Sequence, residues 1–225
     1  MNDNLIMKIF MVKNKLQRLK QKIIWYYQKF NFDSHSYWEK NGGRKYFNSF
    51  HTSKNRNENR FLDFIRKYKP KRILDIGCGY GRYLKSIRNE FPNIELYGSD
   101  ISSTQIEYAK KYLSSDNVNL FVSDSTKYNF QDNFFDLSIG YSIWEHIPPK
   151  NFEIIFNEIR RISKRGYFLE FDRTTKNKYA KSNTHHHIFS YDLDLKFKNN
   201  LISKKLIKGS WGEYLFHLDF KKHNN

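Results

Sequence analysis

A glycine-rich loop is the part of the sequence whose residue types point most directly to chemistry. Gly77, Gly79 and Gly81 lie within five residues, after an apolar segment and before a helical pattern. Glycine permits tight turns and has no Cβ to keep a ligand away from the backbone. Asp75, just before the loop, would repel a pyrophosphate, and the third glycine comes one residue too early for the dinucleotide pattern G-x-G-x-x-G. The loop therefore predicts a cationic ligand held against bare main chain.

Three aspartates accompany successive apolar segments of the chain. Asp75 lies near the end of RILDIG, Asp100 ends IELYGSD and Asp124 ends VNLFVSD, so that about one strand–helix unit separates each from the next. In an open α/β sheet, ligands bind in the crevice at the carboxyl ends of the strands. We therefore expect the three carboxylates to line one crevice.

Five motifs, taken in order, resemble those of a known family. They are ILDIGCGYG, YGSDIS, VSDST, FFDLSIGYSIWEHIP and GYFLEF, and they extend from about residue 71 to residue 171. In this order and spacing they are similar to the small-molecule branch of the class I S-adenosylmethionine-dependent methyltransferases. The resemblance implies a Rossmann-like α/β fold and S-adenosylmethionine as the cofactor.

The resemblance also implies a role for each aspartate. Asp75 would face the ammonium of the methionine portion, directly or through water, Asp100 would accept both ribose hydroxyls, and Asp124 would accept the adenine amino group. A carboxylate suits the ribose because each of its two oxygens can accept a hydrogen bond. Ile101 would lie against the adenine face, and the backbone of Ser125 would lie near the adenine ring nitrogen. The other implied cofactor contacts are Gly77, Cys78, Gly79, Gly81 and Tyr141. Cys78 is expected to fill a variable position of the loop and not to act as a nucleophile.

The segment YSIWEHIPP is the best place to look for the catalytic group. Methyl transfer is an in-line displacement, so the protein must align the acceptor and remove its proton. Histidine side chains in general can take up a proton near neutral pH, which makes His146 the first candidate base. Glu145 is the second, and either residue could instead only orient a neighbour. Trp144 is a candidate substrate contact and, with Tyr80 and Tyr141, a candidate for cation–π attraction, with core packing as the alternative.

The segment 172–187 is rich in cationic residues. They are Arg173, Lys176, Lys178, Lys181, His185, His186 and His187. Three interpretations remain open, namely contact with an acidic or phosphorylated substrate, a solvated basic loop, and a metal site. Alternate side chains of an extended run point to opposite faces, which makes consecutive histidines weak evidence for a metal. We predict no metal and expect Arg173 and the three histidines to contact substrate.

Residues 31–70 are polar and aromatic and are expected to form a lid. The part YWEKNGGRKYFNSFH is similar to the segment that the family folds over its cofactor, and it contains a turn signal at Gly42-Gly43. Its candidate contacts are Tyr37, Trp38, Arg44 and His51, with core packing as the alternative for the aromatic residues. NRFLDFIRKYK then predicts a helix.

Five apolar strands alternating with helices must position these groups. The strands are RILDIG, IELYGSD, VNLFVSD, FFDLSIGYS and GYFLEF, and helices are predicted over about 81–90, 103–113 and 152–162. Near-continuous apolar runs in the strands are typical of a parallel sheet with helices on both faces. The tail LISKKLIKGSWGEYLFHLDFKK predicts an antiparallel hairpin that closes one edge.

The first thirty residues predict an extra, basic amphipathic helix. Its apolar stripe is Leu5, Ile9, Val12, Leu16, Leu19, Ile23, Tyr26 and Phe30, and the other faces carry Lys or Arg residues against a single acid, Asp3. Such a helix suits an anionic membrane or a partner, whereas packing on its own domain and self-association are the alternatives. The chain is thus divided into this helix (1–30), a lid segment (31–70) and a methyltransferase domain (71–225).

Composition limits the classes of protein that remain. The net charge of +17 invites a nucleic-acid interpretation, but the lysines are scattered along the chain and not gathered in one block. The single cysteine, Cys78, excludes an intramolecular disulfide and fits a reducing compartment. No apolar run reaches the roughly 18 residues of a membrane span and no signal-peptide pattern is present. We expect a cytoplasmic protein, with peripheral attachment at the inner membrane face left open.

The sequence therefore predicts a methyltransferase that acts on a small molecule or glycan precursor. We expect O-methylation of an acidic, phosphorylated or sugar acceptor, as in bacterial surface-polysaccharide biosynthesis. A tRNA or rRNA methyltransferase is the first alternative, supported by the charge of +17 and the many aromatic residues. It is opposed by GYSI, which stands where base-methylating enzymes carry a Pro-Pro motif. A catalytically inactive, cofactor-binding regulator is the second alternative.

Overall fold

The computed structural model describes most of the chain. The described residues are 30–50, 58–171, 187–189, 191–207 and 213–221, together with Leu19, Lys20, Ile23, Tyr26 and Tyr27. The helix expected over 1–30 therefore lies mostly outside the described residues, although the individual residues described there are helical. Within these ranges, no helix has both the length and the hydropathy needed to cross a bilayer.

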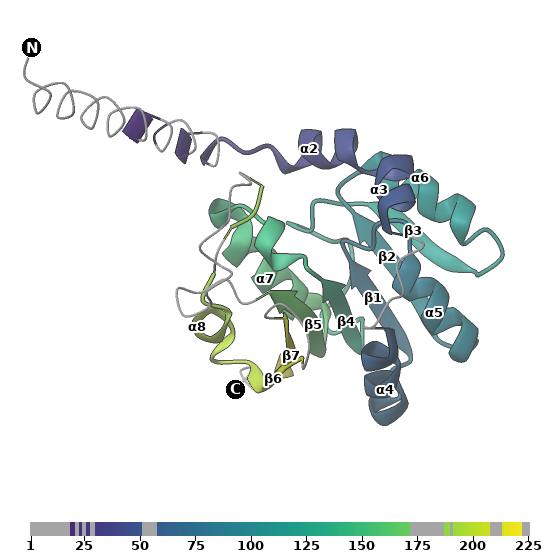
Figure 1. Cartoon of the computed structure of the whole chain (residues 1–225). Coiled ribbons are helices and arrows are strands. Elements are labelled where there is room, and N and C mark those ends of the chain that lie inside the picture. Colours follow the sequence, from purple (N-terminus) through teal and green to yellow (C-terminus); the bar gives the residue numbers. More distant parts are fainter. Residues whose placement is uncertain are drawn as a thin grey trace, which may run out of the picture.

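A seven-stranded mixed sheet forms the centre of the molecule (Figure 1). Its strands are β1 (Arg72–Ile76), β2 (Glu95–Asp100), β3 (Val118–Val122), β4 (Leu137–Tyr141), β5 (Arg165–Phe171), β6 (Leu201–Leu206) and β7 (Glu213–Asp219), in the order β3-β2-β1-β4-β5-β7-β6. The first five strands pair in parallel, and β7 pairs antiparallel with β5 and with β6. The predicted parallel sheet with a C-terminal antiparallel hairpin is confirmed.

The strand register brings the functional ends of the strands together. Asp75 of β1 lies opposite Gly98 of β2, and Asp100 at the end of β2 lies opposite Val122 of β3. Because these neighbours run in parallel, the loops that follow β1, β2 and β3 leave the sheet at the same edge.

Helices cover both faces of the sheet, as predicted (Figure 1). The helices of the described chain are α2 (Ser34–Asn41), α3 (Gly43–Phe50), α4 (Glu58–Tyr68), α5 (Arg82–Glu90), α6 (Ser103–Tyr112), the 3₁₀ turn η1 (Trp144–His146), α7 (Pro149–Ile162) and α8 (Leu193–Phe197), of which α2 and α3 pack on α6 and not on the sheet. The Ser102 hydroxyl caps α6 by accepting a hydrogen bond from the Gln105 N–H at 3.2 Å. Pro149 starts α7, where its fixed φ suits the first helical turn. The sequence did not predict α8, which has only five residues.

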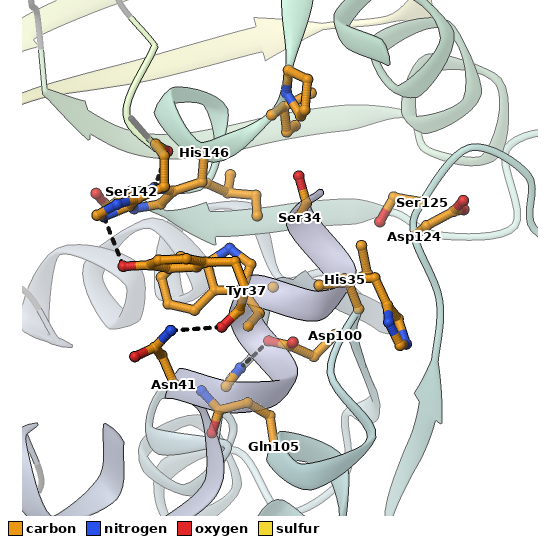
Figure 2. A pocket seen from close by; sticks show the side chains of 18 of the residues that line it. Ser34, His35, Tyr37, Asn41, Asp100, Gln105, Asp124, Ser125, Ser142 and His146 are labelled. Carbon is orange, nitrogen blue, oxygen red and sulfur yellow. Dashed lines mark hydrogen bonds between the residues drawn. The ribbon is translucent and has the colours of Figure 1, made fainter. Parts of the chain in front are cut away.

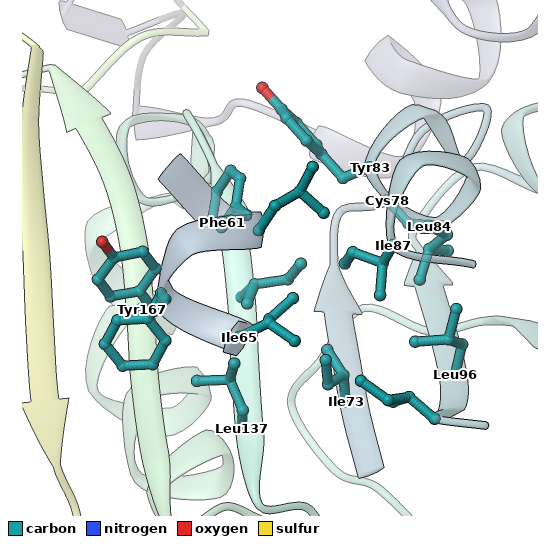
Figure 3. Close-up of a cluster of buried hydrophobic side chains, with 14 of the residues drawn as sticks. Phe61, Ile65, Ile73, Cys78, Tyr83, Leu84, Ile87, Leu96, Leu137 and Tyr167 are labelled. Atoms are coloured by element: carbon teal, nitrogen blue, oxygen red, sulfur yellow. The ribbon is translucent and has the colours of Figure 1, made fainter. Parts of the chain in front are cut away.

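One apolar core lies between the sheet and helices α4, α5 and α6 (Figure 3). Phe61 and Ile65 of α4 pack there with Leu84 and Ile87 of α5 and with Leu96 of β2, and all five are almost completely buried. This core fixes α5, and with it the glycine loop that precedes the helix.

A second core, on the α7 face, is dominated by aromatic side chains. Trp144 is fully buried at its centre, with ring centroids 4.9 Å from Phe152, 5.4 Å from Phe168 and 5.5 Å from Phe197. Aromatic pairs at such separations contribute stability beyond the area they bury. The indole therefore anchors η1 to the α7 face of the sheet.

Replacing Trp144 should destabilise the fold. We expect Trp144→Ala to lower the free energy of unfolding by about 3–5 kcal/mol, because it opens a large cavity among aromatic rings, and Trp144→Phe to lower it less. Leu195→Ala is the control, since Leu195 is 61% exposed and its removal should change the free energy by less than about 0.5 kcal/mol. Urea unfolding measures all three, and an Ala variant as stable as the control would remove Trp144 from the core.

Candidate functional site

A cavity of about 870 Å³ lies at the carboxyl edge of the parallel strands. Its floor includes Gly77, Gly79 and Asp100, and its roof includes Tyr37 of α2 and Tyr46 of α3. Figure 2 shows Asp100, Asp124 and Ser125 at the strand ends, with side chains of α2 facing them. The lid expected over 31–70 thus contributes part of the cavity wall.

The glycine loop leaves main chain exposed to the cavity. Gly77 and Gly79 line it and have φ values of +65° and +55°, in the left-handed region that favours glycine. A Cβ on Gly79 would stand 3.6 Å from both Gln105 Nε2 and Tyr46 Cε1, and these two residues also line the cavity. A side chain at Gly79 would therefore occupy space that a ligand can use.

Gly81 and Cys78, like Asp75, belong to the expected cofactor site but do not line the cavity. Gly81, with φ +85°, precedes α5, and a Cβ there would stand 2.4 Å from Leu113 Cδ1, so its small size serves the packing of α5 beside Leu113. Cys78 is buried in the core beside α5, and burial raises the pKa of its thiol well above the usual value. Cys78 is therefore not a reactive thiol, and both residues shape the loop instead of contacting a ligand in the cavity.

Asp100 connects the glycine loop to the start of α6. Its Oδ2 accepts a hydrogen bond from the Gly79 N–H at 3.0 Å, and its Oδ1 accepts one from the Ser102 N–H at 2.9 Å. Burial raises the pKa of Asp100 to about 6, although both backbone donors favour the ionised form. Each carboxylate oxygen can accept a second hydrogen bond, so the side chain keeps capacity for a ligand.

Asp75 lies behind the cavity wall. The wall is made by the next two residues, Ile76 and Gly77, and the Asp75 side chain is buried. Its Oδ2 has no hydrogen-bond partner within the described part of the chain. Burial, followed by the charge of Asp100, raises the pKa of Asp75 well above the usual value, while Arg82 acts in the opposite direction. Of the two predicted modes of ammonium contact, this position favours the one through water.

The three residues expected around adenine all line the cavity. They are Ile101, Asp124 and Ser125. Asp124 is exposed, and its Oδ1 accepts hydrogen bonds from the Thr126 N–H at 2.9 Å and hydroxyl at 2.7 Å. The Ser125 N–H, expected near a ring nitrogen, donates to the Ser123 hydroxyl at 3.0 Å. A base at this position would have to replace that contact.

His146 lines the opposite part of the cavity, and its tautomer is set by the backbone. Its Nδ1 lies 3.1 Å from the carbonyl oxygen of His187, which can only accept a hydrogen bond. Nδ1 therefore carries the proton, so the neutral ring has its lone pair on Nε2. The ring is also held by stacking on His187 at 5.4 Å and by an edge contact with Trp38 at 5.0 Å.

Glu145, unlike His146, does not line the cavity. It is buried outside the cavity wall and accepts a hydrogen bond from the Ser142 hydroxyl. Its Oε1 lies 3.8 Å from His146 Nε2, which is beyond hydrogen-bond distance. The geometry therefore favours His146 over Glu145 as the candidate base.

Of the three aromatic residues proposed to contact the cofactor or the substrate, one lines the cavity and two do not. Tyr141 lines the cavity, and its hydroxyl donates to Glu213 Oε1 at 2.8 Å. Trp144 does not, because η1 directs its indole into the aromatic core, and the prediction that it contacts substrate is wrong. Tyr80 is also buried away from the cavity, packed against Phe47 with ring centroids 5.0 Å apart.

Only some of the residues predicted in the lid and in the basic loop line the cavity. Tyr37, Trp38 and His187 line the cavity, and the Tyr37 hydroxyl lies 3.3 Å from His187 Nε2. Arg44 is exposed and does not line it. His51, Arg173, Lys176, Lys178, Lys181, His185 and His186 lie outside the described residues.

Sequence reasoning missed the contacts that attach the lid to α6. Glu39 of α2 accepts hydrogen bonds from the Ser103 N–H at 2.8 Å and the Ser103 hydroxyl at 2.7 Å. The Gly43 N–H donates to Gln105 Oε1 at 3.0 Å. The Gly42-Gly43 turn marked the boundary between α2 and α3, but no local pattern indicated that both would pack on α6.

Comparison with known proteins agrees with this geometry. A family model described as "Methyltransferase domain" matches residues 73–166. Malonyl-[acyl-carrier protein] O-methyltransferase 2 of Ilyobacter polytropus is 32% identical over 137 residues, which are 60% of this chain and 51% of that protein. The chain spans between a quarter and about half of the length of the curated relatives it matches.

Solved structures share the fold at lower sequence identity. The PH0226 protein of Pyrococcus horikoshii OT3 has a TM-score of 0.62 at 20% identity, over 79% of this chain and 92% of that one. Geranyl diphosphate C-methyltransferase of Streptomyces coelicolor A3(2), crystallised with S-adenosyl-L-homocysteine, has a TM-score of 0.56 at 14% identity, over 72% and 75% of the two chains. The motifs, the sheet order and the family match lead to one conclusion: residues 73–166 are a methyltransferase domain of the class I S-adenosylmethionine-dependent type.

Proposed function

We propose that the protein transfers a methyl group from S-adenosylmethionine to an oxygen atom of a small acceptor. The observation that carries the proposal is that a single cavity joins the exposed glycine backbone and Asp100 to a histidine whose proton is fixed on Nδ1. The first part suits a nucleoside cofactor and the second suits removal of a proton from an acceptor.

The residues present fit the cofactor of this family. Bare main chain at Gly77 and Gly79 gives a ligand close access to the loop, and Asp100 has remaining acceptor capacity for ribose hydroxyls. Asp75 Oδ2, which has no hydrogen-bond partner among the described residues, lies behind the loop, where the positive charge of the ammonium and the sulfonium would favour the ionised form of this carboxyl group. When bound, the cofactor would supply a methyl carbon activated by a positively charged sulfur.

The chain's own contribution to the reaction is orientation and proton removal. His146 Nε2 would accept the proton of an acceptor hydroxyl, because Nδ1 is already committed to the His187 carbonyl. Tyr37 and Trp38 of α2 cover this part of the cavity and would limit its access to water. A general base placed in this way contributes about 10²–10⁴ in rate.

Size and charge support a small, acidic acceptor. A volume of about 870 Å³ lies in the upper part of the range of about 300–1,000 Å³ for ligand pockets, which leaves room for a small acceptor beside the cofactor. Lys45 and Lys150 contribute to the wall, in addition to His146 and His187. The relative named malonyl-[acyl-carrier protein] O-methyltransferase supports transfer to oxygen. An acidic, phosphorylated or sugar acceptor remains our expectation, and its use in polysaccharide assembly is a further prediction.

A methyl-transfer assay on fractionated cell extract tests this proposal. The protein is incubated with S-adenosylmethionine labelled in its methyl group, and label is counted in the small-molecule, lipid, glycan and RNA fractions. We expect label in the small-molecule or glycan fraction. Label only in RNA would favour the nucleic-acid alternative, and binding without transfer to any fraction would favour the inactive regulator.

Asp100 should be required for cofactor binding. We expect Asp100→Asn to weaken binding of S-adenosylhomocysteine at least about tenfold, since hydrogen bonds to a charged group contribute about 1.5–3 kcal/mol each. Asp124→Asn is the matched control, because this exposed side chain keeps an acceptor oxygen, and we expect less than about a threefold loss. Isothermal calorimetry measures both affinities and circular dichroism checks the fold. Equal affinities for the two variants would remove Asp100 from its assigned role.

Cofactor affinity should decrease in acid. Burial raises the pKa of Asp100 to about 6, and ribose hydroxyls that donate to the carboxylate would lower it in the complex. Above pH 6 the group is already ionised, whereas below pH 6 it must lose a proton to bind, so affinity falls as the pH falls. We expect S-adenosylhomocysteine to bind about tenfold more weakly at pH 5 than at pH 7. A change of slope near pH 6 that persists in Asp100→Asn would belong to another group.

His146 should act on turnover and not on cofactor binding. We expect His146→Gln to lower the rate of methyl transfer to the labelled fraction about 10²–10⁴-fold, because glutamine cannot accept the proton. The affinity for S-adenosylhomocysteine should stay within about threefold of the original, since His146 belongs to the acceptor part of the cavity. A variant with unchanged turnover would place the base elsewhere.

A further inference from the structure

An exposed apolar face is formed by residues that come just before the first cavity-lining residues in the sequence. Leu19, Ile23, Tyr26 and Phe30, here called the N-terminal apolar face, are helical and are 54%, 60%, 66% and 83% exposed. Steps of four, three and four residues place them on one side of a helix. Tyr27, next to Tyr26 in the chain, is also exposed. The remaining exposed large apolar residues of the described chain are scattered over α6, β3, α7, α8 and β6, so this N-terminal region is the place where they gather.

The charges around this face favour one kind of occupant. Between residues 1 and 30 the sequence has seven Lys or Arg residues and a single acid, and Lys20, beside the face, is exposed. A helix with an apolar face and a basic polar side is the type that lies in the interface of an anionic membrane. Pairing with a second copy would bring two strongly basic helices together, which like-charge repulsion opposes.

The face is joined directly to the cavity wall. The Asn31 N–H donates to the Tyr27 carbonyl at 3.0 Å, and the next residues, Phe32 and Asp33, line the cavity together with Asn31. Phe32 is buried and packs against Phe189 with ring centroids 5.9 Å apart, which fixes this junction to the domain. In Figure 1 the described residues before α2 lie outside the layers of sheet and helices.

We infer that the N-terminal apolar face binds the surface of an anionic lipid bilayer. Its apolar side chains enter the interface between headgroups and acyl chains, and the neighbouring lysines contact anionic headgroups. The junction at Phe32 then holds the cavity near the bilayer, where an acceptor carried by a lipid can reach it.

Vesicle co-sedimentation of the full chain tests this inference. The probes are vesicles of phosphatidylcholine alone and of equal parts phosphatidylglycerol and phosphatidylcholine, each at low and high salt. We expect binding to the anionic vesicles, at least tenfold weaker binding to the neutral ones, and loss of binding as salt rises. The double variant Ile23→Asp/Tyr26→Asp should bind the anionic vesicles at least tenfold more weakly.

The matched control is Ile202→Asp, which adds one charge at a 43% exposed apolar position on β6 and should bind as the original does. Thermal unfolding and affinity for S-adenosylhomocysteine verify that each variant is folded. Absence of binding at low salt overturns the inference. Equal binding by the double variant and the control also overturns it, because the scattered lysines would then suffice. A dimer in light scattering that the double variant abolishes would assign the face to a second copy of the chain.

Discussion

The buried carboxylate of Asp100 accepts the N–H groups of Gly79 and Ser102, and these two hydrogen bonds join the loop after β1 to the start of α6. The rest of the cavity depends on this link, because Gly77 and Gly79 reach the cavity only while the loop keeps its left-handed turns. A carboxylate suits the position since both oxygens can hold a backbone donor and still accept a ligand. Burial makes the group costly, and the raised pKa of about 6 reflects that cost.

A second buried acid, Asp75, adds to this cost. Asp100 forms part of the cavity floor and Asp75 lies behind it, and the charge of Asp100 raises the pKa of Asp75 further. Two neighbouring carboxyl groups do not easily ionise together, and a positively charged ligand stabilises their ionised forms. A sulfonium nucleoside with an ammonium group has charge of that sign. A positively charged cofactor bound here would therefore favour the ionised form of both carboxyl groups, and Arg82 already acts in that direction on the pKa of Asp75.

The sequence predicted the parts of the site that local spacing determines. The strand ends, the glycine loop and the extent of α6 follow from apolar runs and glycines, all of which act on their near neighbours in the chain. Trp144 could not be placed, because its direction depends on a 3₁₀ turn and on aromatic partners from β5, α7 and α8. The different surroundings of Glu145 and His146 have the same origin, because the 3₁₀ turn η1 directs these adjacent side chains to different places, and only His146 lines the cavity.

The roof of the cavity is tied to the elements that hold the cofactor. Glu39 of α2 binds the first residue of α6 and Gly43 of α3 binds Gln105, so both lid helices rest on the helix that begins just after Asp100. At the other end Tyr37 stacks on His187, whose carbonyl fixes the proton of His146. A displacement of α2 would therefore change contacts at the start of α6 and at the candidate base together. An acceptor that entered beneath α2 would disturb both sets of contacts, and its binding would then be linked to the geometry that orients His146.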